Sequence, residues 1–260
     1  MRESLVALWQ HRDLIWSFAV RDMKARYKQT ALGIAWAMLQ PLSMAVVFTL
    51  VFSLFARLPS DGIPYPVFVY SALIFWTFFA NSISGGTVSM VANSPLIRKI
   101  YFPRETLIVS VLLATALDLL LASTIFGGML LWYRIPLTAA ALWVVPLVLL
   151  QAILSFAMAS TLAALHVNFR DIGHGLPLLL QIWMFASPVA YPISAIPSWL
   201  VPYYLLNPMA GIIDGYRRAL LRGLPPDWGA LGISALITVV VLAAALPIFR
   251  HAERTFADVI

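Results

Sequence analysis

The sequence predicts an all-α membrane protein with six transmembrane helices, an N-terminal amphipathic interfacial helix and short re-entrant helices between spans five and six. Three observations predict this fold class. Of the 260 residues, 62% are hydrophobic and only 11% are charged, whereas a soluble domain carries about a quarter charged residues. Several apolar runs reach the length of about 20 residues that crosses the hydrocarbon core of a bilayer. Lys and Arg gather beside these runs.

The charge and the lack of cysteine narrow the function classes. The net charge is +6, but membrane topology explains basic residues beside spans, and no soluble basic domain is present to bind nucleic acid. With 0 Cys, disulfides, thiolate metal sites and a cysteine nucleophile are ruled out. The N-terminal region is too charged for a cleaved signal peptide. We expect one membrane domain over 1–260, with an interfacial helix (1–30), a six-span region (31–249) and a cytoplasmic tail (250–260).

Residues 4–28 are typical of an amphipathic helix that lies at the headgroup boundary of a membrane. Its apolar residues fall near one helical face: Leu5, Leu8, Trp9, Ile15, Trp16, Ala19 and Met23. The basic cluster at its end marks the cytoplasmic side and offers a docking surface where the first span enters the bilayer. The residues expected at this cytoplasmic interface are Arg21, Asp22, Lys24 and Arg26. An ordinary solvated leader helix is the alternative.

Six apolar runs follow, and each is interpreted as a membrane span: 32–56, 66–90, 107–132, 139–165, 176–192 and 229–249. At about 1.5 Å per residue, five of them are long enough to cross. The fifth is short and contains Pro188, which predicts a kinked or partial crossing. Twelve of the 17 Lys and Arg fall on the side of the N-terminal cluster, which predicts that both termini are cytoplasmic. The five outside are Arg57, Arg134, Arg217, Arg218 and Arg222.

The loop at 193–228 contains the signals of a short helix. Asn207 is a suitable N-cap, Pro208 occupies the first helical position, and Gly223 follows the end. An apolar stripe comprises Ile212, Ile213, Tyr216, Ala219 and Leu220, and the residues interpreted as lying off it are Asp214, Arg217 and Arg218. We expect short, partly buried helices that cover the outer end of a pore. An inert surface loop is the alternative.

The search for catalytic chemistry finds little. The G-x-x-x-x-G-K-[ST] phosphate loop is absent, so the chain cannot bind ATP in that way. The four His residues lack metal-ligand spacing, and no metal site is expected. Asp118 is the only acid well inside a span, and such acids are candidates for function. A hydrogen-bonded packing contact explains Asp118 equally well.

Two cytoplasmic loops carry residues suited to a partner protein. In the first loop, 93–105, a basic and apolar segment lies between two prolines and has the shape to press into a groove. Its candidate contact residues are Arg98, Lys99, Tyr101 and Phe102. The second loop, 166–174, has Arg170 and Asp171 at the cytoplasmic end of a span. A generic anchoring loop is the alternative for both.

Aromatic residues are abundant in the spans, and aromatic rings can stack on the apolar faces of sugars. The candidates for a glycan path are Trp36, Phe75, Trp76, Phe79, Trp183, Phe185 and Tyr191. The competing interpretation for any one of them is that its ring faces lipid or packs between helices.

With these residues in place, the chain resembles a known family, the membrane permease subunits of ATP-binding-cassette exporters of bacterial polysaccharides, such as O-antigen and teichoic acid. The similarity is carried by an ordered set of segments: RDMKARYKQTALGIAWAMLQPL (21–42), PSDGIPYPVF (59–68), LIRKIYFPRE (96–105), NFRDI (168–172), SPVAYP (187–192), NPMAGIIDGYRRALL (207–221) and the C-terminal ERTFADVI. Each segment is weak alone, but the ordered set spans nearly the whole chain.

The resemblance implies a transporter subunit rather than an enzyme, located in the bacterial inner membrane. Two such permeases would form a pore with two separate ATPase subunits, which bind the ATP and magnesium. The substrate would be a glycan on an undecaprenyl-diphosphate lipid, with O-antigen first among the family's cargoes. The loop at 93–105 would couple to the ATPase, and Arg170 and Asp171 would form a second contact. Capsule, teichoic acid, a drug or a small lipid are alternative cargoes. An integral-membrane enzyme acting on lipid-linked sugars is the rival from another class.

Overall fold

The computed structural model describes residues 9–28, 30–100, 102–253 and 256. It is helical, and the described residues include no strand. Five segments are long and apolar enough to cross a membrane: Gly33–Phe55, Tyr65–Ala92, Glu105–Trp132, Ala139–Asn168 and Trp228–Glu253. The chain is therefore a multi-pass membrane protein, and the predicted all-α class is confirmed at this level.

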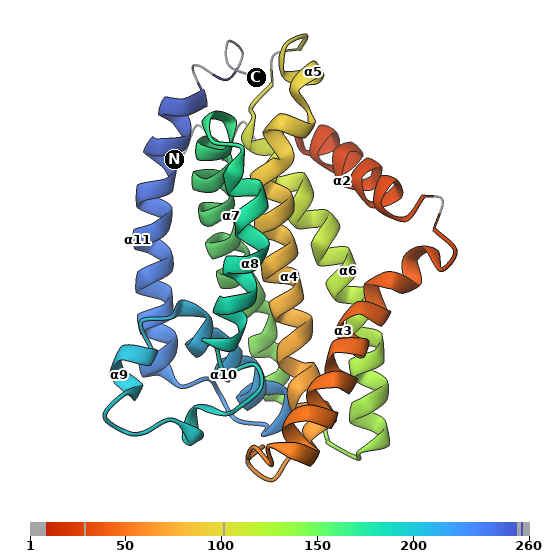
Figure 1. Ribbon diagram of the computed structural model, residues 1–260, viewed down its shortest axis with the longest axis vertical. Helices are drawn as coiled ribbons and strands as arrows, with labels where there is room; N and C mark the ends of the chain where they lie inside the picture. Colours follow the sequence, from red (N-terminus) through yellow and green to blue (C-terminus); the bar gives the residue numbers. More distant parts are fainter. Residues whose placement is uncertain (1–8, 29, 101, 254–255, 257–260) are drawn as a thin grey trace.

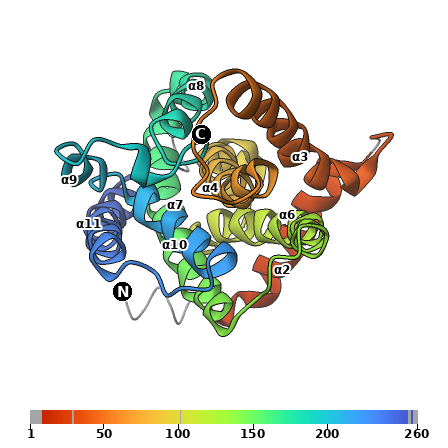
Figure 2. The same ribbon diagram turned by 90° about the horizontal axis from the view of Figure 1, so that it is seen from below.

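Helix α4 (Tyr65–Ala92) is the central element of the bundle. Around it stand α3 (Trp36–Phe48), α6 (Glu105–Trp132), α7 (Val144–Asn168) and α8 (Asp171–Phe185), as Figure 2 shows. Helix α11 (Trp228–Glu253) packs on the outer side of α7. Because α4 is enclosed in this way, 78% of its most apolar window is buried, against 17% for α11.

Small residues bring the central helices close together. A Cβ atom added at Gly86 of α4 would lie 2.7 Å from the Cβ of Ala159 in α7, nearer than carbon atoms pack. Four residues earlier, the hydroxyl of Ser82 lies 2.7 Å from that of Thr115 in α6. Ser82 and Gly86 thus let α4 approach both neighbours, as small residues do between membrane helices.

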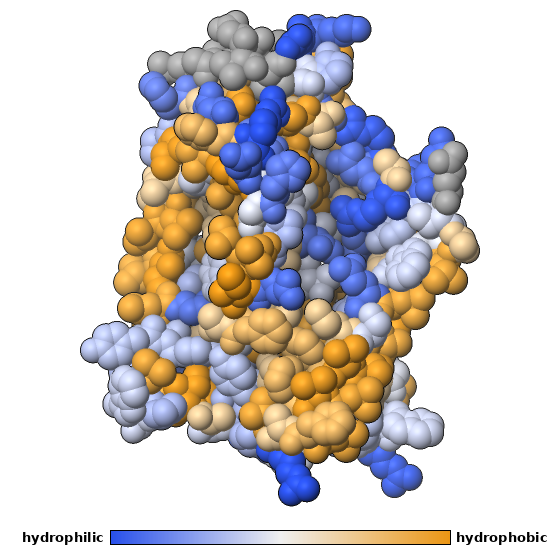
Figure 3. Space-filling view, viewed as in Figure 1, coloured by the Kyte–Doolittle hydropathy of each residue, from blue (hydrophilic) through white to orange (hydrophobic). Residues whose placement is uncertain are grey.

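The first apolar segment leans away from the bundle (Figure 1). It begins with the 3₁₀ turn Gly33–Ala35, continues as α3 with Pro41 inside, and ends in the π-helical stretch Thr49–Phe55. Its exposed large apolar side chains are Trp36, Met44, Val46, Val47, Leu50, Val51, Leu54 and Phe55. Orange, hydrophobic surface covers this region and α11 in Figure 3, as expected where lipid or another membrane chain is the neighbour.

Helix α2 (Arg12–Tyr27) packs across α6 at one end of the bundle. Ile15 and Ala19 are buried, but Trp9 and Trp16 are 72% and 55% exposed. Neighbouring helical residues are about 100° apart. The apolar residues that the sequence placed on one face therefore lie on two: Ile15 and Ala19 face the bundle, and Trp9 and Trp16 face outward. Leu5 and Leu8 lie outside the described residues.

The expected fifth span differs from the structure. Instead of 176–192, the helix is Asp171–Phe185, only 15 residues long, or about 22 Å at about 1.5 Å per residue. The chain then leaves the helix before Pro188 and Pro192, in a turn held by side chains. Six spans are therefore not confirmed, because five segments reach the length of a full crossing. The run that falls short is the fifth, which was expected to be kinked or to cross only partly.

The two ends of the bundle differ in their elements (Figure 1). One end carries α2, the short helix α5 (Ser94–Ile97), the turn between α7 and α8, and the end of α11. The other carries the 3₁₀ turns Ala139–Trp143 and Ile193–Ala195, with α9 (Val201–Tyr204) and α10 (Pro208–Leu221).

The short helix expected in the loop at 193–228 is present as α10. The amide of Met209 donates to Oδ1 of Asn207 at 3.1 Å, and Gly223 adopts a φ of +66° just past the end. One detail of the prediction is wrong: Arg217, expected off the apolar stripe, is 4% exposed. It follows Ile213 by one helical turn and therefore lies on the same face.

Candidate functional site

A groove lined by both polar and apolar side chains lies between α3, α4 and α8. It encloses about 370 Å³ and opens to the side of the chain; the space-filling view shows it as a hollow between apolar surfaces (Figure 3). Its polar lining residues are Gln40, Ser43, Thr77, Asn81, Ser84 and Gln181. Polar side chains within a membrane bundle face the interior or a water-filled cavity. The groove therefore places six polar side chains between membrane-spanning helices.

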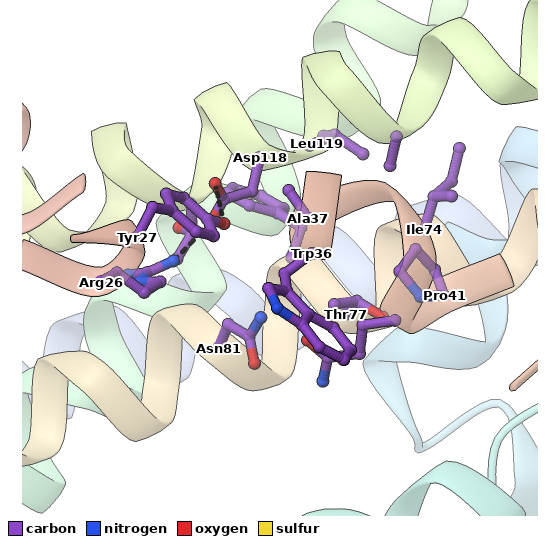
Figure 4. Close-up of a pocket in the computed structure, with 14 residues that line it drawn as sticks. Arg26, Tyr27, Trp36, Ala37, Pro41, Ile74, Thr77, Asn81, Asp118 and Leu119 are labelled. Carbon is purple, nitrogen blue, oxygen red and sulfur yellow. Dashed lines mark hydrogen bonds and ion pairs between the residues drawn. The ribbon is translucent and has the colours of Figure 1, made fainter. Parts of the chain in front are cut away.

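A second cavity of about 250 Å³ continues the groove between α2, α3, α4 and α6 (Figure 4). Both hollows are lined by Gln40, Pro41, Thr77 and Asn81. Trp36 and Asn81 face this second cavity (Figure 4). Six polar residues line these two hollows, and we call them the polar strip: Gln40, Ser43, Thr77, Asn81, Ser84 and Gln181.

Asp118 lies at the edge of the second cavity and is bound by two residues of α2. Arg26 forms an ion pair with it, and the hydroxyl of Tyr27 donates to Oδ1 at 2.7 Å (Figure 4). Burial, followed by the hydrogen bond to Asp118, raises the pKa of Tyr27 to about 12, so the phenol keeps its proton. This is the geometry of the hydrogen-bonded contact that the sequence left open. It joins the N-terminal helix to a membrane-spanning helix.

The candidate ATPase-coupling residues gather at the end of the bundle that carries α2 and α5. Arg98 and Lys99 follow α5 and are exposed. Arg170 is the N-cap of α8 and Asp171 its first residue, and both are also exposed. Phe102 is only 5% exposed and meets the ring of Phe18 edge-on at 6.0 Å. Tyr101 lies outside the described residues. Phe102 thus supports the loop from within instead of projecting from it.

Two exposed apolar residues at this end lie beside the candidate coupling residues. Ile100 and Phe169 are 58% and 63% exposed, and each adjoins one of the two cation-bearing segments. An apolar side chain beside charged ones is the composition of a protein-binding surface. Phe169 was not singled out from the sequence; its signal was an apolar residue between Asn168 and Arg170, just past a predicted span.

The four residues expected at the cytoplasmic interface play different structural parts. The guanidinium of Arg21 donates to Oδ1 of Asp22 and to Oδ1 of Asn93, both at 2.8 Å, which connects α2 to the residue before α5. Arg26 is engaged with Asp118. Lys24 is exposed on the outer face of α2. The cluster therefore combines two positioning contacts with one outward charge.

The aromatic candidates for a glycan path separate into three groups. Phe75 and Phe79 are buried in the core, and Phe75 stacks on Tyr216 with 3.5 Å between ring centroids. Trp36 and Trp76 line the two hollows.

The other three surround the end of α8. The indole of Trp183 donates to Oδ1 of Asn207 at 3.0 Å, and the hydroxyl of Tyr191 donates to the carbonyl of Phe185 at 2.9 Å. Phe185 itself is 46% exposed. Five of the seven aromatic candidates thus pack or position helices, and only Trp36 and Trp76 line the hollows. The polar strip, which sequence reasoning missed, lines the hollows with them. Its signal was polar residues at helical spacing, Thr77, Asn81 and Ser84, inside an apolar run.

Among the described residues, no three His, Asp or Glu side chains form a group that could hold a metal ion.

Comparison with known proteins agrees with this architecture. Residues 13–221 match the model of the ABC-2 type transporter family. The chain is similar to the O-antigen export system permease protein RfbA of Myxococcus xanthus, with 32% identity over 255 residues that cover 96% of each protein. RfbA of Klebsiella pneumoniae is 27% identical over 252 residues, 95% of each protein. The polysialic acid transport protein KpsM of Escherichia coli is 27% identical over 240 residues, 90% of this chain and 92% of KpsM.

Proposed function

The chain belongs to the membrane family of ABC-2 type transporters, and we propose that it is the channel-forming subunit of an ATP-driven exporter of lipid-linked polysaccharide. The observation that carries the proposal is the polar strip, a set of polar side chains that line hollows inside a bundle of apolar helices. The named relatives support a glycan cargo, because the similarity extends over nearly their full length. The chain supplies a path and no catalytic group; hydrolysis belongs to a partner.

We infer that two copies of the chain face each other across the polar strip. The groove is open on one side, so a single chain surrounds only part of a polymer. Exposed apolar side chains flank the opening on both helices, including Met44 and Val47 on α3 and Leu179 and Ile182 on α8. Burying these side chains against a second copy would turn two half-grooves into one polar channel with an apolar rim.

The partner ATPase is proposed to bind the end that carries Arg98, Lys99, Arg170 and Asp171. Two copies of it would bind the ATP and magnesium, and this chain would need no cofactor of its own. Behind these residues, Phe102 packs among the ends of several helices, together with Phe18, Phe249 and Phe256. Such a packed cluster moves as a unit. Closure of the ATPases would therefore tilt the helices that border the polar strip and widen it.

The membrane placement follows from the same assignment. The end with α2 and α5 would face the cytoplasm of a bacterial inner membrane, with both termini on that side and α2 at the interface. Helix α8, extended by 186–192, would make the fifth of six crossings, and α9 and α10 would be the re-entrant helices at the outer face. The whole of 1–260 would form one permease domain. The proposed cargo is a glycan on an undecaprenyl-diphosphate carrier, with O-antigen ahead of capsule and teichoic acid.

Two measurements test this function. The tagged chain is purified in mild detergent from its host, and we expect a phosphate-loop ATPase to co-purify with measurable hydrolysis. In cells lacking the chain, lipid-linked glycan should accumulate on the cytoplasmic face of the membrane. Its sugars and their linkages should be the same as in cells that have the chain. Loss of dye efflux without glycan accumulation would instead indicate a small-molecule exporter. Glycan of altered linkage would indicate an enzyme of the membrane.

A further inference from the structure

The turn that follows α8 is held mainly by side chains. Five carbonyls of the segment 186–191 accept hydrogen bonds from side chains of α4 and of the region around α10. The donors are Asn207 to Ala186 (3.1 Å), Arg217 to Pro188 (2.5 Å), Val189 (2.6 Å) and Tyr191 (3.2 Å), and Tyr65 to Ala190 (2.8 Å). Buried backbone groups require partners, so these side chains determine the shape of the turn.

Arg217 is the centre of this arrangement. Its guanidinium donates to three carbonyls of the turn, lies 3.6 Å from the ring centroid of Phe68, and donates to the Phe68 carbonyl at 3.4 Å. The residue is 4% exposed, and none of the ion pairs among the described residues involves it. Carbonyl dipoles and an aromatic face thus compensate a buried charge that would otherwise be very unfavourable.

The shape of the guanidinium matters as much as its charge. A planar group with donors on several edges can bind carbonyls that converge from different directions, whereas a lysine ammonium is a compact charge at the end of a flexible stem. In this structure Nη1 of Arg217 donates to the carbonyls of Pro188 (2.5 Å) and Tyr191 (3.2 Å), and Nη2 donates to the carbonyl of Val189 (2.6 Å). Lysine at position 217 would keep the charge and lose part of this geometry.

The contacts join three elements that border the outer end of the polar strip. Arg217 belongs to α10, Phe68 and Tyr65 to the first turns of α4, and the carbonyls to the segment that ends α8. Helix α8 contributes Leu180, Gln181 and Met184 to the groove. The distance of its end from α4 therefore sets the width of the groove at that end.

We propose that Arg217 is a positioning residue for transport, which fixes the outer end of α8 against α4 and α10 and thereby sets the outer opening of the path. The inference rests on the proposed transport function. A cargo of sugars would pass beside this turn without touching Arg217, since the guanidinium is buried. Arg217 acts through the carbonyls that it holds.

The test uses the absence of cysteine from the chain. Ala190 lies in the turn and is 4% exposed, so A190C reports whether the turn stays closed. In the full complex in native membranes, a membrane-impermeant maleimide added from outside should label A190C slowly. Combined with R217M, the same cysteine should react at least about tenfold faster, because loss of the hydrogen bonds opens the turn. R217K should give an intermediate rate.

Two controls separate positioning from general loss of structure. A210C, at a 0%-exposed position of α10 at the same end of the bundle as the turn, should remain unreactive with R217M. R218M removes a neighbouring charge whose Nε donates to the Pro225 carbonyl at 3.0 Å, outside the turn, and should leave A190C slow. If A190C stays slow in R217M, or if A210C becomes reactive with it, the positioning role is overturned.

The transport measurement adds a readout that a folding anchor alone would not change. R217M should keep its ATPase partner and its hydrolysis while glycan export falls at least about tenfold, with partial recovery in R217K. Full export by R217M would overturn the proposal. The rate of labelling of A190C does not depend on the cargo. If R217M raises that rate as expected, but the unchanged chain exports no glycan, the proposed function is overturned and the positioning role is not.

Discussion

Arg26 and Asp118, 92 positions apart in the sequence, form an ion pair that joins α2 to α6. Tyr27 donates to the second oxygen of the same carboxylate at 2.7 Å. The carboxyl side chain is 11% exposed and the guanidinium 35%, so the acid is nearly removed from water and the base is not. This pair is thus one of the contacts that hold the N-terminal helix on the bundle, and it borders the cavity of Figure 4.

Replacement of Asp118 by Ala should destabilise the protein, because it leaves Arg26 and Tyr27 without their shared acceptor. The expected loss is about 1–3 kcal/mol of unfolding free energy, measured as a lower midpoint of thermal unfolding in detergent. The combined exchange R26D/D118R should recover part of the loss, since it restores opposite charges.

The control for this pair is Arg12–Asp13, whose side chains are 60% and 92% exposed. An exposed pair contributes about 0–1 kcal/mol, so D13A should leave the midpoint nearly unchanged. Equal effects of D13A and D118A, or no recovery in the exchanged double variant, would contradict the importance assigned to the buried pair.

Reversing the charges at Arg98 and Lys99 should uncouple the transporter. R98E/K99E places two acids where the proposed partner meets two cations, and like-charge contacts weaken binding and slow association. We expect the variant to reach the membrane in normal amounts, to retain less ATPase in pull-downs and to export glycan poorly. R57E/R134E, with the same change of charge at the opposite end of the bundle, should export normally. Undiminished export by R98E/K99E would remove the coupling assignment.

Gly86 should not tolerate a larger side chain. The methyl group of G86A would lie 2.7 Å from the Cβ of Ala159, and relief of that clash requires α4 and α7 to separate. Overpacking of this kind costs about 1–3 kcal/mol, visible as a lower unfolding midpoint. G127A in α6 is the matched control, because its added methyl group meets nothing within 4 Å. A stable G86A would show that the two helices do not pack as closely as described.

The sequence predicted the features that depend on local composition. Apolar runs located five of the helices, and the order Asn207, Pro208 and Gly223 predicted α10, because each residue type acts through its own backbone geometry. These signals do not require knowledge of distant contacts.

Features that depend on distant partners were missed or misplaced. The fifth helix ends at Phe185 instead of 192, because the carbonyls that follow are held by residues of α4 and α10. Arg217 was expected off the apolar stripe of α10 because arginine is usually solvated. Its spacing from Ile213 and Leu220 is that of one helical face, so the pattern was the better guide than the residue type. Neither the helical spacing of Arg217 nor its residue type could show that carbonyls of the segment 186–191 compensate its charge.

The central claim is that the polar strip is the path of a polymer, and Asn81 offers the most direct measurement because it lines both hollows. In the cysteine-free chain, N81C should react with a small hydrophilic maleimide in the complete transporter. Reaction should slow at least about tenfold when lipid-linked glycan is present and the ATPase is arrested with a non-hydrolysable ATP analogue. L120C, on the 65%-exposed outer side of α6, should be unaffected by glycan. If glycan gives N81C no protection, the polar strip is not the path.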